Sequence, residues 1–133
     1  MSLLVDTSVW SLAMRKDGLS SVPEVNVLVK AIDSGSEIYS TGIILQELLQ
    51  GFSKPKAHDS IIERFASIPM LVPDTSDHIN ATDLRNQCRR KGVQVGTIEA
   101  LIAHLSLRFK LILLSTDKDF KHMSKVVKLS FPK

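Results

Sequence analysis

Leu3-Leu4-Val5-Asp6-Thr7-Ser8 is the stretch of sequence on which the fold depends. A short apolar run is followed at once by an acid and two hydroxyl residues. The run has the length of a buried strand and is too short for a signal sequence or a membrane span. In open parallel sheets, ligands bind beyond the carboxyl ends of the strands. We therefore expect a strand that ends at Asp6, a turn that begins at Thr7 and Ser8, and a functional site at Asp6.

The composition fits one globular domain over residues 1–133, of which 44% are hydrophobic and only 5% aromatic. A single cysteine excludes an internal disulfide, and no apolar run approaches the roughly 20 residues of a membrane helix. We expect a soluble, cytoplasmic protein. The net charge of +3 permits an anionic partner such as nucleic acid but does not require one.

Strands and helices alternate along the sequence. After the first strand, we expect strands at 37–40, 70–72, 111–114 and 126–129. Helices are expected at 10–15, closed by residues 16–18, and from Ser21 or Val22 to about 33, 43–52, 57–67, 74–91 and 97–109. This order predicts an α/β fold in which a central parallel β-sheet is flanked by helices on both faces.

Two of the predicted strands are followed by acids at their carboxyl ends. Asp6 follows the first strand, and Asp117 follows the strand 111–114 after two hydroxyl residues. If both strands are parallel and central, both carboxylates emerge at the same edge of the sheet. A helix N-cap or a turn is the alternative role for such an acid, and for Asp119 the two roles stay equally open.

Two further acids lie on helices that follow such loops. Glu47 lies about a turn and a half after Gly42 and could point back at Asp6, or it could lie on a solvated helix face. Glu99 lies at the border of an apolar stripe beside small residues, which suggests space for a ligand; the alternative is a first-turn Glu that interacts with the helix dipole. His104 falls on the polar side and is expected at the surface.

Carboxylates that converge repel one another, and a divalent cation would offset this repulsion. Oxygen ligands suit magnesium or manganese rather than zinc. The histidines have no paired zinc spacing; they are His58, His78, His104 and His122. A magnesium site at the sheet edge of a basic protein suggests phosphodiester chemistry.

Four motifs of the sequence resemble the PIN-domain family, and the chain looks like a VapC-type toxin ribonuclease of a type II toxin–antitoxin system. Each motif is weak alone, but together, in order and in a chain of this length, they are fairly specific. They are Val-Asp-Thr-Ser at 5–8, Leu-Gln-Glu-Leu at 45–48, Gly-Thr-Ile-Glu-Ala-Leu-Ile-Ala-His at 96–104 and Leu-Ser-Thr-Asp-Lys-Asp-Phe at 114–120.

The resemblance implies a PIN-like fold and a Mg²⁺-dependent endoribonuclease, with Mn²⁺ as a substitute metal. The family's acidic catalytic positions fall on Asp6, Glu47, Glu99 and Asp117. The implied metal ligands are Asp6, Glu99 and Asp117; the accessory residues are Asp119, Thr7 and Thr116. The resemblance also implies an RNA substrate, with tRNA as one candidate, a small cognate antitoxin that covers the site, and a homodimer.

Glu99 departs from the family pattern, which usually has Asp at this position. The extra methylene moves the carboxylate outward, and a misplacement of about 1 Å can cost ~100-fold in rate. The alternative function is therefore a weakened or inactive PIN module that binds RNA or an antitoxin without cutting. A phosphatase with an Asp nucleophile is disfavoured, because Ser8 stands where its second Asp is expected.

Basic residues near the predicted acids are candidates for RNA binding. His78, Arg85 and Arg89 lie along one side of the helix 74–91, and Lys118 follows Asp117. Such side chains contact phosphates without reading sequence, and a solvated surface is the alternative for each. Apolar side chains of the helices 43–52 and 57–67 form either ordinary core or a groove for the antitoxin; they are Leu45, Leu48, Leu49, Ile61, Ile62 and Phe65.

Overall fold

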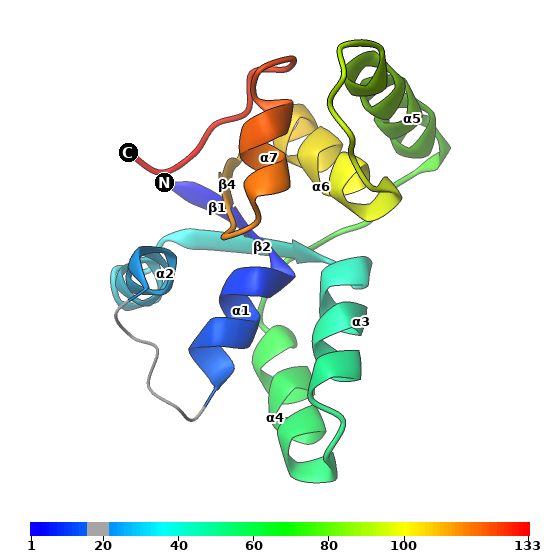
Figure 1. Ribbon diagram of the computed structural model, residues 1–133. Coiled ribbons are helices and arrows are strands. Elements are labelled where there is room, and N and C mark those ends of the chain that lie inside the picture. The colour runs from blue at the N-terminus through cyan, green and yellow to red at the C-terminus, as the bar shows by residue number, and fades with distance from the viewer. Residues whose placement is uncertain (16–21) are drawn as a thin grey trace.

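A computed structural model describes residues 1–15 and 22–133, which form a parallel sheet surrounded by helices (Figure 1). The strands are β1 (Ser2–Val5), β2 (Glu37–Thr41), β3 (Met70–Leu71) and β4 (Ile112–Leu114), in the order β3-β2-β1-β4. Every strand pair is parallel. β1 lies inside the sheet, and its apolar residues, Leu3, Leu4 and Val5, are fully buried. The predicted α/β fold with a parallel sheet is confirmed.

Apart from α2, the helices lie in two groups, one on each side of the strands. Figure 1 shows α1, α3 and α4 on one side of the strands and α5, α6 and α7 on the other. Their bounds are α1 (Thr7–Met14), α2 (Pro23–Asp33), α3 (Gly42–Gly51), α4 (Pro55–Phe65), α5 (Thr75–Arg90), α6 (Thr97–Arg108) and α7 (Lys118–Met123). In the described ranges, 1–15 and 22–133, no helix is long and apolar enough to cross a bilayer.

The register of the sheet places the ends of β1 and β4 side by side. Val5 is paired with Leu114, and the N–H of Asp6 donates to the carbonyl of Leu114 at 2.9 Å. The residues that follow the two strands therefore leave the sheet at the same edge. On the other side of β1, β2 leads directly into α3, which carries Glu47. The sheet thus positions three segments that carry predicted site residues.

Several element boundaries differ from the sequence-based expectation. α1 begins at Thr7, so Thr7 and Ser8 lie in the first turn of a helix rather than in a separate turn. Residues 126–129 do not form a strand, because the N–H groups of Val126 and Val127 both donate to the carbonyl of Met123 in a turn after α7. The expected end of the first helix at 16–18 and a start of the next at Ser21 lie outside the described residues.

Some apolar side chains on or next to the helices are exposed. Val29 and Ile32 on α2 are 47% and 52% exposed, and Phe109 after α6 is 39% exposed. On α6 the small residues are buried instead: Ala100, Ala103 and Ser106. Small side chains let neighbouring elements approach the helix closely, so the buried face is wider than the apolar stripe suggests.

A buried carboxylate joins α5 to α6. Asp77 takes the N–H of Asp74 in a capping box, and its oxygens lie 2.8 Å from Nε2 of His104 and 2.6 Å from Nη1 of Arg108. Burial alone would raise the pKa of Asp77, but the hydrogen bonds from Asp74 and His104 and the charge of Arg108 outweigh it and lower this pKa to about 2. The expectation that His104 lies free at the surface is wrong, because its side chain is only 13% exposed and contacts Asp77.

Candidate active site

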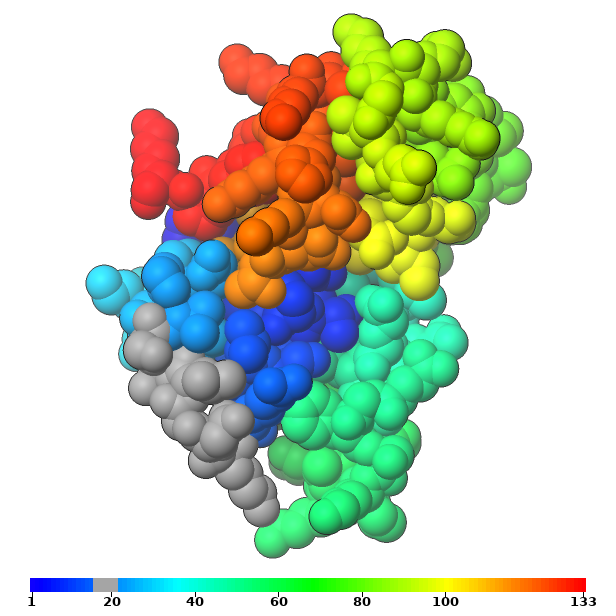
Figure 2. All heavy atoms as spheres, viewed as in Figure 1, coloured from blue at the N-terminus to red at the C-terminus, as the bar shows by residue number. Residues whose placement is uncertain are grey.

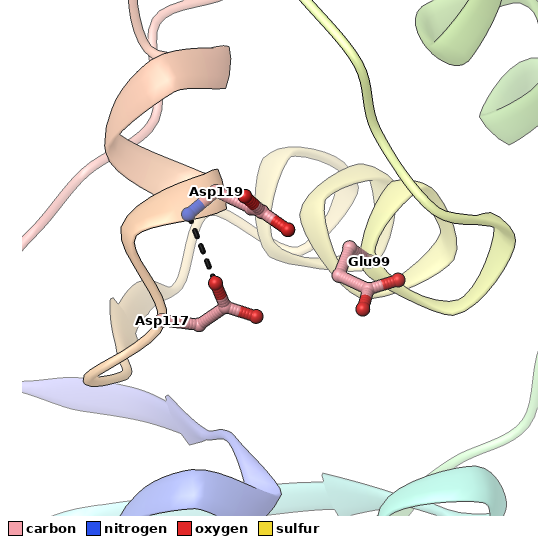
Figure 3. Close-up of side chains that lie close together, drawn as sticks. All are labelled: Glu99, Asp117 and Asp119. Atoms are coloured by element: carbon pink, nitrogen blue, oxygen red, sulfur yellow. Dashed lines mark hydrogen bonds between the residues drawn. The ribbon is translucent and has the colours of Figure 1, made fainter.

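Glu99, Asp117 and Asp119 form a compact group of carboxylates beyond the end of β4. Each is half-buried and offers one oxygen, and these oxygens lie within 4.8 Å of one another. Figure 3 shows that Glu99 comes from α6, whereas Asp117 and Asp119 come from the start of α7. The N–H of Asp119 donates to Oδ1 of Asp117 at 2.9 Å, so Asp117 is also the N-cap of α7. This cap keeps both aspartates at the same end of the short helix.

Serine hydroxyls connect Asp6 to this group. Oδ2 of Asp6, a buried side chain, accepts from Oγ of Ser115 at 2.8 Å and from Oγ of Ser8 at 2.9 Å. Ser115 Oγ also accepts the N–H of Asp117 at 2.9 Å, and Ser8 Oγ accepts the N–H of Thr116 at 3.1 Å. The Asp6 carboxylate and the loop that carries Asp117 are therefore fixed to each other.

Glu47 is held toward the end of β1 by a neighbour of Asp6. Oγ1 of Thr7 donates to Oε1 of Glu47 at 2.8 Å. Thr7 is in the first turn of α1, and Glu47 is in α3. Figure 2 shows the segment around α1 (blue) at the surface between α7 (orange) and α3 (green-cyan), so the elements that follow β1, β2 and β4 reach one face of the molecule.

The structure thus arranges the predicted acids in two linked sets. In the described part of the chain, the group within 4.8 Å contains Glu99, Asp117 and Asp119 but not Asp6 or Glu47. Asp6 is connected to it through Ser115, which also binds the N–H of Asp117. Glu47 is bonded to Thr7, the residue after Asp6. Asp119, expected as an accessory acid, lies within the compact group.

Sequence reasoning missed two positioning hydroxyls, those of Ser8 and Ser115. Thr116, expected to orient a carboxylate or water, is exposed and enters the network through its backbone N–H. A signal for Ser115 was available, since it is the first residue after β4 and β4 pairs with β1. The register that puts it opposite Asp6 was not available without the structure.

Two pockets contain most of the predicted RNA-binding residues, and one of them also includes Asp119. One, of about 530 Å³, is lined by Arg85, Arg89, Gln94, Val95, Gly96 and Asp119. The other, of about 600 Å³, lies between α3, α5 and α6 and includes His78 and Arg85. Arg85 is held in place, because its Nε donates to the carbonyl of Val95 at 3.0 Å. Lys118 is exposed directly after Asp117.

The chemistry of the compact group fits a hard divalent cation. Its three potential ligand atoms are all carboxylate oxygens, which suit Mg²⁺ or Mn²⁺. Within residues 1–15 and 22–133, no Lys, Arg or His side chain forms an ion pair with Glu99, Asp117 or Asp119. The negative charge at this site is therefore left for a cation to offset.

Comparison with known proteins identifies the family of this chain. The sequence model of the PIN domain family matches residues 3–126, almost the whole chain. A search of curated proteins finds no match.

Solved structures share the fold at low sequence identity. FitAcB from Neisseria gonorrhoeae has a TM-score of 0.74 at 19% identity, over 98% of this chain and 96% of that chain. VapBC2 from Rickettsia felis, solved with a DNA fragment from its promoter, has a TM-score of 0.74 at 22% identity, over 99% and 98%. VapC20 from Mycobacterium tuberculosis, described as a sarcin–ricin loop cleaving toxin, has a TM-score of 0.68 at 15% identity, over 97% and 99%.

Proposed function

The chain belongs to the PIN-domain family, and on this premise we propose that it is a metal-dependent endoribonuclease that hydrolyses RNA phosphodiester bonds. The observation that carries the proposal is the group of three carboxylates within 4.8 Å of one another, joined through Ser115 to the buried Asp6. We assign catalytic roles to Asp6, Glu47, Glu99 and Asp117, and an accessory role to Asp119.

Mg²⁺, for which Mn²⁺ can substitute, would be held by Asp6, Glu99 and Asp117. When bound, such an ion makes water more acidic and offsets the charge of the scissile phosphate. The residues of the chain supply orientation. Ser8 and Ser115 occupy Oδ2 of Asp6 and leave Oδ1 for a ligand, because no hydrogen bond to Oδ1 is found in the described ranges.

Glu47 is the proposed proton acceptor. Thr7 holds one oxygen of its carboxylate at 2.8 Å, and the other oxygen is left to orient the attacking water and to take its proton. Thr116 is retained as an accessory residue, because its N–H fixes the position of Ser8.

The RNA backbone would lie along the basic residues that border the acids. Arg85 and Arg89 line the same pocket as Asp119, so their guanidinium groups are available to a phosphate that enters this pocket. His78 lies nearer the start of α5 and lines the second pocket together with Arg85, and Lys118 is the first residue of α7. We propose a structured RNA as substrate, with tRNA as one candidate.

We further propose a toxin–antitoxin role in the cytoplasm. The support is that FitAcB and VapBC2 share the fold over nearly the full length of this chain. A small cognate antitoxin would cover the site, and the toxin would form a homodimer. Of the apolar residues considered for a groove, Leu48, Ile61 and Phe65 are buried in the core, whereas Ile62 on α4 is 46% exposed and available to a partner.

A PIN module that binds RNA or antitoxin without cutting is the competing function. Glu99 favours it, because Asp is usual at this position in the resembling toxins. The geometry favours the enzyme, since the longer side chain still brings its carboxylate into the compact group.

A cleavage assay against a mixed tRNA pool separates the two functions. The wild-type chain is expected to cut RNA with Mg²⁺ or Mn²⁺ and to lose all cleavage with a chelator or with Asp6→Asn. Glu99→Asp, assayed in parallel, tests whether the longer side chain limits the rate. Cleavage that survives complete removal of divalent metal would rule out the proposed mechanism, and RNA binding without cleavage by both chains would favour the non-catalytic module.

A further inference from the structure

Gly96 precedes α6 and has no backbone reason to be glycine. Its φ of −74° and ψ of 162° are extended values that any residue adopts. The position is the N-cap of the helix, where glycine ranks with Thr, below Ser, Asp and Asn and well above Ala. The backbone conformation therefore admits a side chain at residue 96, and the surrounding space decides whether one fits.

The space above Gly96 is filled by the carboxylate of Glu99. A Cβ placed on Gly96 would clash with Oε2 of Glu99 and would lie 3.1 Å from its Cδ and 3.4 Å from its Oε1. All three of the nearest atoms belong to this one carboxylate. By contrast, a Cβ on Gly42 or Gly51 would meet nothing within 4 Å.

The same carboxylate belongs to the compact group. One of its oxygens lies within 4.8 Å of ligand atoms of Asp117 and Asp119. A glutamate reaches farther than an aspartate by one methylene, so it must fold back to present its carboxylate at the distance an aspartate would reach. In this chain it folds back over the bare backbone of residue 96.

We infer that Gly96 is a positioning residue for Glu99: the missing side chain at residue 96 provides the room that lets the longer acid keep its place beside Asp117 and Asp119. The inference rests on the proposed metal-binding role of this group. Any side chain at residue 96 would push the Glu99 carboxylate away from its position. An aspartate three residues after the N-cap tolerates a side chain at the N-cap: at the start of α5, Asp77 accepts the N–H of Asp74, which carries a Cβ. With the shorter acid at residue 99, glycine at residue 96 would therefore not be needed.

The test is a double-mutant cycle between the two residues, read by Mn²⁺ binding to the full chain without RNA. Gly96→Ala is expected to weaken Mn²⁺ binding by about 10-fold or more, the range seen when residues that orient metal ligands are changed. In the Glu99→Asp background, the same Gly96→Ala change is expected to have less than about threefold effect on Mn²⁺ binding, well below that range. Gly51→Ala is the matched control and should leave binding unchanged.

Thermal unfolding without metal separates positioning from folding. Gly96→Ala is expected to lower the unfolding temperature slightly and to a similar extent in both backgrounds, because alanine is a weaker N-cap than glycine. Equal loss of Mn²⁺ binding in both backgrounds, or no loss in either, would overturn the inference.

The outcomes also separate this inference from the proposed function. A wild-type chain that binds Mn²⁺ but does not cut RNA would contradict the ribonuclease alone, and the cycle would still decide the role of Gly96. A wild-type chain that binds no Mn²⁺ would overturn both.

Discussion

The hydroxyl of Ser115 donates to Oδ2 of Asp6 at 2.8 Å, although the two residues are 109 positions apart in the sequence. The same hydroxyl accepts the N–H of Asp117 at 2.9 Å. One side chain thus sets the orientation of the buried acid at the end of β1 and the position of the acid-bearing loop after β4.

Removing this hydroxyl should disturb the site more than the fold. Ser115→Ala is expected to lower the RNA cleavage rate by about 10- to 100-fold, because a displacement of about 1 Å among catalytic groups has this effect. The free energy of unfolding should fall by only about 1 kcal/mol, the net value of one hydrogen bond. Ser115→Thr retains the hydroxyl and should retain most of the activity. Cleavage at the wild-type rate by Ser115→Ala would mean that the hydrogen bond from Ser115 to Asp6 is not needed for activity.

The hydrogen bond from Thr7 to Glu47 predicts a second loss of activity. Thr7→Val keeps the shape of the side chain but removes the donor, so the Glu47 carboxylate is no longer held. We expect a decrease of about tenfold in cleavage rate, within the contribution of a positioned general base. Thr7→Ser, which keeps the donor, is the control. Equal rates for the Val and Ser variants would show that the contact has no role in the reaction.

The pocket beside Asp119 predicts which basic residue contacts RNA. Arg89 lines this pocket, and Arg89→Glu should weaken RNA binding and lower the slope of log affinity against log salt by about 1 to 2, as expected when a phosphate contact is replaced by a repulsion. Arg90 is the next residue on α5, is exposed and does not line the pocket, so Arg90→Glu is the matched control. Equal effects of the two reversals would indicate a general charge effect rather than a contact at the pocket.

The buried Asp77 predicts a stability that depends on acid pH. Its pKa is lowered from 3.8 to about 2 in the folded chain, so its stabilising effect is complete above about pH 3.8 and is lost as the pH falls through about 2. Asp77→Asn should lower the free energy of unfolding by about 1–3 kcal/mol at pH 7, where His104 and Arg108 lose a charged partner. The difference in free energy of unfolding between the wild type and Asp77→Asn, measured by urea unfolding, should decrease between pH 4 and pH 2. A difference in stability that stays constant over this pH range would show that Asp77 does not titrate with a lowered pKa.

Much of the fold could be predicted from local sequence patterns. The strand at Leu3–Val5 and the apolar run before Ser115 stand out because buried parallel strands are continuous apolar segments. The strand expected at 126–129 was wrong because a four-residue, mostly apolar segment does not show whether a partner strand is available, and the N–H groups of Val126 and Val127 bond within the turn after α7 instead. The helix α7 was missed because it has only six residues.

The acids of the site could be found from the sequence, but the residues that position them by hydrogen bonds could not. Ser8 and Ser115 are ordinary hydroxyl residues in the sequence, and only the pairing of Val5 with Leu114 brings them to the same carboxylate. Asp77 and His104 are similar, because each looks like a surface residue on its own helix until α5 and α6 pack together. Contacts between distant segments depend on register, which local patterns do not specify.

The place of β1 between β2 and β4 has a consequence for the making of this protein. On a ribosome, β1 emerges before the other strands of the sheet, yet one of its edges must stay unpaired until residues 112–114 have been synthesised. The loop that anchors Asp6 follows that strand, so no shorter nascent chain contains an assembled site. Pairing between such distant segments is slow to form, which delays assembly further. The site is therefore completed only when the last strand of the sheet docks against the first, β4 against β1.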